Sequence, residues 1–229
     1  MQLPSYWLPR PPMRLDQTTQ ATFDQLLTTA LAQGISPLLD YTLTAPKWQF
    51  LCYLAEHHAI ALHGSGNPNI SQFTPRQPID LTEFGSQRAV YAADDGIWAL
   101  FFAIADRDRY PMSLLNSCIR IAQAPAPISE PLYVFSVSRT ARPQQPWRDG
   151  VVYLLPRATF TAQPSVQVDT IVIHPAQLAS LVPVTPLARL AVTPADFPFL
   201  AQVREHDDAR LSDYAAAMNT GAPWPEINP

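Results

Sequence analysis

The segment LHGSGNPNISQFTPRQPIDLTEFGSQRAVYAADDGIWALFFA (residues 62–103) decides our expectation of the fold. A short apolar run ends abruptly at His63, and a second short apolar run surrounds Tyr91. A polar loop (64–87) joins them, and an apolar, aromatic-rich helical pattern follows the second run. Two strands that each end in a polar or aromatic side chain, joined by a long polar loop, predict the floor and rim of a ligand pocket.

The sequence His-Gly-Ser from residue 63, Val-Tyr-Ala-Ala from residue 90 and the apolar helix after them resemble the first two blocks of the ADP-ribosyltransferase superfamily. The resemblance is to the branch with a His, a Tyr and a late acidic residue, which includes poly-ADP-ribose polymerases, diphtheria-type toxins and small rifampin-modifying enzymes. It covers residues 59–103 well and the later strands loosely. It implies an α+β fold with split antiparallel β-sheets and a cleft that binds NAD as substrate.

The resemblance also implies roles for single residues. His63 would bind a ribose hydroxyl, and the main chain of Gly64 would meet the nicotinamide amide, where a missing Cβ permits close approach of the ligand. Tyr91 would stack on the nicotinamide ring, Ser65 would hydrogen-bond nearby, and Arg76 would contact the pyrophosphate or the adenosine. Each residue also has an ordinary explanation: His63 as a loop histidine with its hydrogen bonds made, Tyr91 as a core aromatic, and Arg76 as a solvent-facing charge.

The third position of the pattern departs from the family, which has Glu or sometimes Asp near the start of a late strand. Gln177 stands at that place in the segment 176–184. A glutamine amide can bind the ribose but carries no negative charge to stabilise an oxocarbenium-like transition state. Asp169 offers a true carboxylate and is the alternative third residue. If Gln177 holds the position, we expect weak, altered or absent activity.

Three functions follow as hypotheses. The first is an NAD-dependent mono-ADP-ribosyltransferase or NAD glycohydrolase, toxin-like or otherwise, that transfers ADP-ribose and releases nicotinamide. The second is a catalytically weak or inactive module of the same fold that binds a nucleotide or a protein partner. The third is a relative of RNA 2′-phosphotransferases, for which Arg76, Arg88 and Arg120 are the candidate phosphate ligands. The acceptor of ADP-ribose, whether protein, nucleic acid, small molecule or water, stays open.

Composition narrows the class of protein. The 229 residues include 25 prolines and 7 glycines, which predict stiff loops and short strands in an irregular α+β protein. A net charge of −4 and a single lysine, Lys47, disfavour broad binding of a nucleic-acid backbone. Cys52 and Cys118 lie in apolar runs and are expected to be buried thiols. The histidines show no zinc-type spacing, so no metal is expected.

The start of the chain lacks the layout of a signal peptide, and no apolar run reaches the length of a membrane span. We therefore expect a cytoplasmic protein with no membrane partner.

We expect an N-terminal arm and helical cap (1–58) followed by one ADP-ribosyltransferase-like domain (59–229). The Pro-rich tail from Pro223 is expected to be loose. Periodicity and turn residues predict helices at 18–33, 46–58, 96–106, 195–206 and 211–218, and strands at 59–63, 89–92, 117–122, 132–138, 151–156, 166–173 and 186–192.

Overall fold

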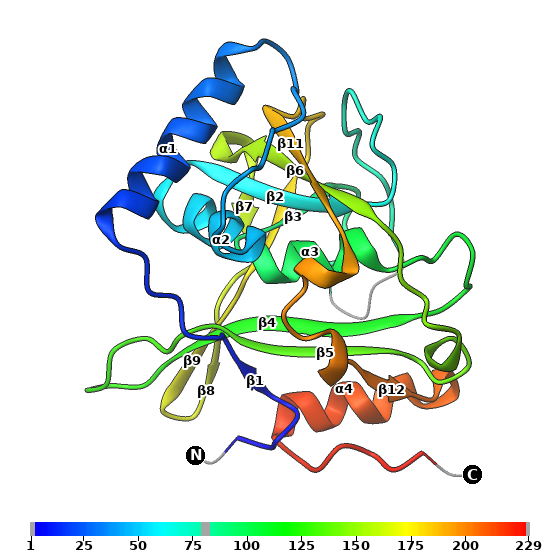
Figure 1. Cartoon of the computed structure of the whole chain (residues 1–229). Helices are drawn as coiled ribbons and strands as arrows, with labels where there is room; N and C mark the ends of the chain where they lie inside the picture. Colours follow the sequence, from blue (N-terminus) through cyan, green and yellow to red (C-terminus); the bar gives the residue numbers. More distant parts are fainter. Residues whose placement is uncertain (1–2, 79–82, 228–229) are drawn as a thin grey trace.

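The computed structural model describes residues 3–78 and 83–227. Figure 1 shows helices and two β-sheets, one above the other in the view. The α-helices within the described ranges are α1 (Gln17–Ala32), α2 (Lys47–His57), α3 (Gly96–Ile104) and α4 (Leu211–Thr220).

The upper sheet of Figure 1 has the strand order β11-β6-β2-β3-β10-β7. Its strands are β2 (Ile60–Ser65), β3 (Val90–Ala93), β6 (Gly150–Pro156), β7 (Thr161–Ala162), β10 (Gln177–Ser180) and β11 (Ala188–Val192). The lower sheet has the order β1-β5-β4-β9-β8, and β12 also pairs with β5. Its strands are β1 (Leu8–Pro9), β4 (Leu114–Ala122), β5 (Leu132–Ser138), β8 (Val166–Val168), β9 (Ile171–Pro175) and β12 (Arg204–His206). Among these strands, pairing is antiparallel except between β12 and β5.

The helix α3 lies between the two sheets (Figure 1) and supplies the centre of the core. Every residue of α3 except Phe102 is buried, and the ring of Phe101 is 4.8 Å from that of Phe135 in β5. The helix α2 packs on α3, and α1 covers α2 through the edge-on contact of Phe23 with Phe50 at 5.2 Å. Residues of α1, α2, α3 and both sheets therefore form one apolar cluster.

The outer faces of the sheets carry two smaller clusters. The cluster on the upper sheet is centred on Tyr153 and Phe73, whose rings meet edge-on at 5.1 Å. The cluster on the lower sheet joins the two ends of the chain, because Trp224 lies 5.3 Å from Tyr6 and 4.9 Å from Tyr214. The expected loose tail from Pro223 is therefore wrong: an indole that can bury itself against two tyrosines fixes it in place.

Most expected elements are found within a few residues of their predicted bounds, and two expectations are wrong. The segment 166–173 is not one strand but the hairpin of β8 and β9, which turns at Asp169 with a φ of 50°. The expected helix 195–206 is instead a pair of short 3-10 turns followed by β12. Pro198 has no N–H to donate within a helix, and this breaks the segment.

The α+β class is confirmed, with two sheets built of mainly antiparallel pairs. Cys52 and Cys118 are both buried and free, as expected, and burial raises the pKa of each thiol well above its usual range. Within the described ranges, no helix combines the length and the apolar character needed to cross a membrane.

Candidate functional site

Three of the expected site residues lie on three neighbouring strands of the upper sheet. His63 is on β2, Tyr91 on β3 and Gln177 on β10. The pairing between β2 and β3 consists of Leu62 opposite Ala93. A continued antiparallel register would place the residue after His63 opposite Tyr91, but among the described residues the ladder has no further pair. We call this break in the β2–β3 ladder the gap.

His63 lies at that gap. Its Nδ1 is 2.7 Å from the main-chain oxygen of Tyr91. Because a carbonyl oxygen only accepts, Nδ1 carries the proton and Nε2 keeps a lone pair when the ring is neutral. Burial lowers the pKa of His63 and the charge of Arg107 adds to this, although the bond to Tyr91 opposes them. The ring is therefore a neutral imidazole near neutral pH, with Nε2 as an acceptor.

The side chains of His63 and Tyr91 point to opposite faces of the upper sheet. Ala61, two residues before His63, belongs to the outer cluster, and the His63 ring itself lies 4.6 Å from Phe73 of that cluster. Ala93, two residues after Tyr91, belongs to the inner cluster around α3. Since side chains alternate along a strand, the Tyr91 ring shares the α3 face. The imidazole and the phenol ring are therefore connected across the gap through the main chain of Tyr91.

Tyr91 also holds the loop in front of β3. Its hydroxyl lies 2.8 Å from the main-chain oxygen of Phe84 and 2.9 Å from that of Gln87. Arg76 approaches β3 through its main chain, which exchanges hydrogen bonds of 3.0 and 3.1 Å with Ala89, while its side chain is exposed. Residues 79–82 of the loop lie outside the described residues.

Gly64 is a glycine for a reason that differs from our expectation. A Cβ at this position would lie 2.0 Å from the main-chain oxygen of Ala99 and 2.6 Å from the nitrogen of Ala103, both in α3. The missing side chain therefore lets β2 pack against α3, and it does not clear space for a ligand. The next residue, Ser65, accepts a hydrogen bond of 3.1 Å from the main-chain nitrogen of Asn67 and so shapes the turn after β2.

The two alternatives for the third position are far apart in the fold. Gln177 pairs with Ala93, and Ala179 pairs with Tyr91, so the half-buried Gln177 is a diagonal neighbour of Tyr91 on the α3 face. Asp169 is an exposed residue in the β8–β9 turn of the lower sheet. Of the two alternatives, the structure places Gln177 on the strand beside Tyr91 and Asp169 in the other sheet.

The three arginines considered as phosphate ligands do not gather at one place. Arg88 lies near Arg76, since its Nε is 3.5 Å from the main-chain oxygen of Pro75. Arg120 is on β4 in the lower sheet, where its Nη2 donates to Glu56 at 2.8 Å. This separation disfavours the phosphotransferase hypothesis.

Asp95, which lies between β3 and α3, did not figure among the expected site residues. It is buried, it caps α3 by accepting from the main-chain nitrogen of Trp98 at 2.8 Å, and it accepts from the Tyr133 hydroxyl at 2.7 Å. Burial raises the pKa of Asp95, and both hydrogen bonds lower it. The Asp-Gly pair in front of an apolar helical run is the sequence signal that identifies such a cap.

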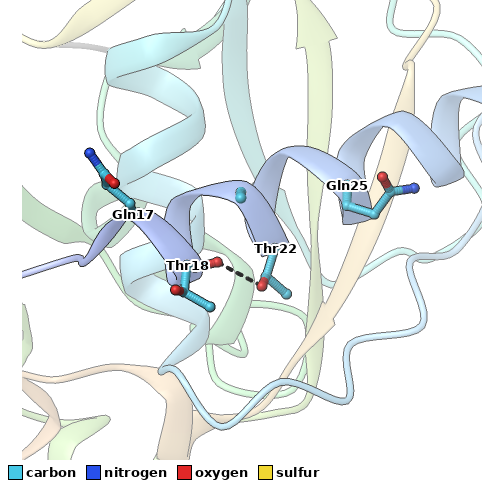
Figure 2. Close-up of a pocket in the computed structure, with 5 residues that line it drawn as sticks. Gln17, Thr18, Thr22 and Gln25 are labelled. Carbon is cyan, nitrogen blue, oxygen red and sulfur yellow. Dashed lines mark hydrogen bonds between the residues drawn. The ribbon is translucent and has the colours of Figure 1, made fainter.

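Two surface hollows lie elsewhere, and neither includes His63, Tyr91 or Gln177. Figure 2 shows the first, on the exposed face of α1, where the Thr22 hydroxyl donates to the Thr18 carbonyl at 2.8 Å. Its lining residues are Gln17, Thr18, Ala21, Thr22 and Gln25. The second hollow lies beyond α1 and is lined by Leu31, Gly34, Ile35, Thr185, Pro186 and Leu187. Neither lining carries a charged or titratable group that could perform chemistry.

Within residues 3–78 and 83–227, no group of three or more His, Cys, Asp or Glu side chains is placed to hold a metal ion. No protein-family model, no curated protein and no solved structure matches this chain. Its function must therefore be proposed from the geometry of the site.

Proposed function

We propose that the chain is an NAD-dependent mono-ADP-ribosyltransferase or NAD glycohydrolase, with its site at the gap between β2 and β3. One observation carries the proposal: the neutral His63 imidazole is fixed by Tyr91 where the ladder ends, with Nε2 as an acceptor. An acceptor nitrogen suits the hydroxyl of a ribose. Gln177 on the adjacent strand adds an amide on the Tyr91 side of the gap.

The proposed reaction breaks the bond between the ribose C1′ and the nicotinamide nitrogen. Nicotinamide leaves with the bonding electron pair as a neutral base, and the ribose gains oxocarbenium character until an acceptor or water attacks C1′. The ligand must reach both faces of the sheet at the gap: the Tyr91 ring would meet the cationic nicotinamide from the α3 face, where Gln177 also lies, and His63 would meet a ribose hydroxyl from the outer face. The Gln177 amide binds the ribose but supplies no negative charge to the transition state, so turnover should be slow.

The second candidate function is a module that binds NAD or ADP-ribose without turnover. The observation that favours it is the neutral amide of Gln177 at the place beside Tyr91, where a carboxylate would serve catalysis.

The test is a calorimetric titration of the whole chain with NAD, with nicotinamide release followed in the same sample. Binding with release supports the enzyme, and binding without release supports the binding module. His63→Ala and Tyr91→Ala should each weaken NAD binding about tenfold or more, because each removes a direct contact. Unchanged affinity in both variants would refute both functions.

Two matched variants separate binding from folding. His174→Ala removes another half-buried strand histidine, which binds Ser165 at 2.7 Å in the lower sheet, and it should leave NAD affinity unchanged. Tyr91→Phe keeps the ring and removes the hydroxyl contacts with the loop, so it should retain most of the affinity that Tyr91→Ala loses.

A further inference from the structure

Arg148 lies at the end of β2, just beyond the proposed ribose contact. A Cβ placed on Gly66 would lie 1.9 Å from Cζ of Arg148, 2.1 Å from Nη2 and 2.2 Å from Nε. The guanidinium therefore rests on the bare Cα of Gly66, three residues after His63. The chain around it is fixed, since the main-chain nitrogen of Arg148 donates to Ile104 at the end of α3 at 2.9 Å.

One edge of this guanidinium is held, and the other edge has no hydrogen-bond partner within the described part of the chain. Nη1 contacts Asp106 at 3.4 Å and also binds Asp108. Nε is buried, and no acceptor for it lies among the described residues. Nε–H and the parallel N–H of Nη2 form the pair of donors that matches two oxygens of a phosphate or carboxylate. A buried donor without a partner is costly, so a ligand oxygen at this edge would stabilise the arrangement.

A second positive charge lies in the same region. Arg107 is exposed, and it is close enough to His63 and to Asp108 to lower the pKa of each. The two positive charges of Arg107 and Arg148 offset the two negative charges of Asp106 and Asp108. A dianionic group that approaches the two guanidinium groups would therefore not face a surface of net negative charge. The selectivity for the anion would then come mainly from the free edge of Arg148.

We propose that Arg148, resting on Gly66 and assisted by Arg107, binds the diphosphate of the dinucleotide whose ribose His63 holds. This inference rests on the proposed function and adds the part of the ligand that the gap itself does not contact. It gives Arg148 the pyrophosphate contact that was expected of Arg76, whose exposed side chain lies on the loop in front of β3.

The decisive variant is Gly66→Ala, which removes no charged group. The added methyl group would displace the flexible end of Arg148 while β2 itself can stay where it is. We expect Gly66→Ala and Arg148→Gln each to weaken binding of NAD and of ADP-ribose about tenfold or more. Neither should change the affinity for nicotinamide riboside, which has the ribose and no phosphate. Arg109→Gln, an exposed arginine over the Tyr110 ring at 5.3 Å, is the matched control and should change nothing.

Inorganic pyrophosphate separates this inference from the proposed function. If NAD binding depends on His63 but is unchanged in both Gly66→Ala and Arg148→Gln, the diphosphate site is refuted and the proposed function stands. If the chain binds pyrophosphate through Arg148 but does not bind NAD, the anion site is supported and the proposed function is refuted. If neither pyrophosphate nor NAD binds in a way that depends on Arg148, the inference is overturned.

Discussion

At the scale of single residues, the protonation state of His63 controls the proposed contact. A neutral ring offers Nε2 to a ribose hydroxyl, and a protonated ring offers a second donor in its place. The lowered pKa of His63 keeps the ring neutral to a pH below its ordinary value of about 6.5. NAD affinity should therefore be constant near neutral pH and fall as the pH passes down through the lowered pKa. His63→Gln retains a non-titrating acceptor and should bind NAD more weakly with no such fall. A pH dependence of NAD affinity that is the same in wild type and His63→Gln would contradict this.

In the proposed reaction, the expected rate depends on Gln177. Gln177→Glu adds a carboxylate beside Tyr91 and should raise nicotinamide release about tenfold or more, since negative charge stabilises the oxocarbenium-like transition state. Gln163→Glu makes the same charge change next to β10, where the main chain of Gln163 binds that of Gln177 at 2.9 Å. A rise in both variants would indicate a general effect of charge, and no rise in Gln177→Glu would favour the binding module.

The sequence was a better guide to which residues lie beside the gap than to the direction in which their side chains point. His63, Tyr91 and Gln177 could be chosen from their order along the chain, but the opposite faces of His63 and Tyr91 depend on strand register. Arg148 could not be predicted as a site residue, because its position depends on a contact with Gly66, which lies 82 residues earlier in the sequence (148 − 66).

At the scale of secondary-structure elements, the contact between β2 and α3 depends on Gly64. Gly64→Ala places a methyl group 2.0 Å from main-chain oxygen in α3, which cannot rotate away. We expect a loss of about 1–3 kcal/mol in the free energy of unfolding, measured in urea. Gly66→Ala is the matched control and should lose far less, because the atom it meets ends a flexible side chain. Equal losses would show that the packing of α3 is not the cause.

The strand β12 should make stability depend on pH. His206 is fully buried and binds Ser136 through Nδ1 at 2.8 Å and Ser113 through Nε2 at 2.6 Å, with Asp208, Asp207 and the Tyr214 ring nearby. Burial lowers the pKa of His206 against the opposing effect of Asp208. The unfolded chain binds a proton near pH 6.5 and the folded chain does so only at lower pH, so stability falls as the pH falls through this window.

One such site contributes a slope of at most about 1.4 kcal/mol per pH unit. His206→Gln should reduce the slope measured by urea unfolding between about pH 7 and pH 5.5, and His174→Gln should leave it unchanged. A slope that is the same in wild type and His206→Gln would contradict the role of His206.

Helices with regular apolar spacing were predictable, and segments governed by distant partners were not. The bounds of α1 and α2 follow from their own sequence, including the cap at Asp16 that accepts from Thr19 at 2.8 Å. The segment around His206 has helical spacing, but it pairs with β5. Its histidine is buried beside the side chains of Ser113, Ser136 and Asp208. Tertiary contacts here outweigh local propensity.

At the scale of the whole molecule, Trp224 ties the two ends of the chain to the lower sheet. Its Nε1 donates to the main-chain oxygen of Glu205 at 3.2 Å, and its ring contacts Tyr6. Trp224→Ala should lower the free energy of unfolding by about 2 kcal/mol, less than for a fully buried indole. It should also make residues 3–16 more accessible to limited proteolysis, whereas Glu226→Ala, an exposed change in the same tail, should do neither. Equal cleavage rates in the two variants would contradict this role.

The α+β class could be read from composition and alternating runs, but the arrangement of two sheets around α3 could not. It depends on buried contacts such as Phe101 with Phe135, whose positions are set by both sheets together. The parallel pairing of β12 with β5 likewise joins segments about 70 residues apart, for example Ser136 and Arg204.

The short edge strands have a consequence for the behaviour of the protein at high concentration. Growth of amyloid-like fibres begins when an open strand edge recruits the same edge of another copy. In the described chain β7 and β1 have two residues each and β8 and β12 three each, and the longer β11 has its outer edge engaged by Leu38 beside Arg189. Such edges offer a poor template, so concentrated solutions should resist fibre formation even though the sheets themselves are rich in apolar side chains.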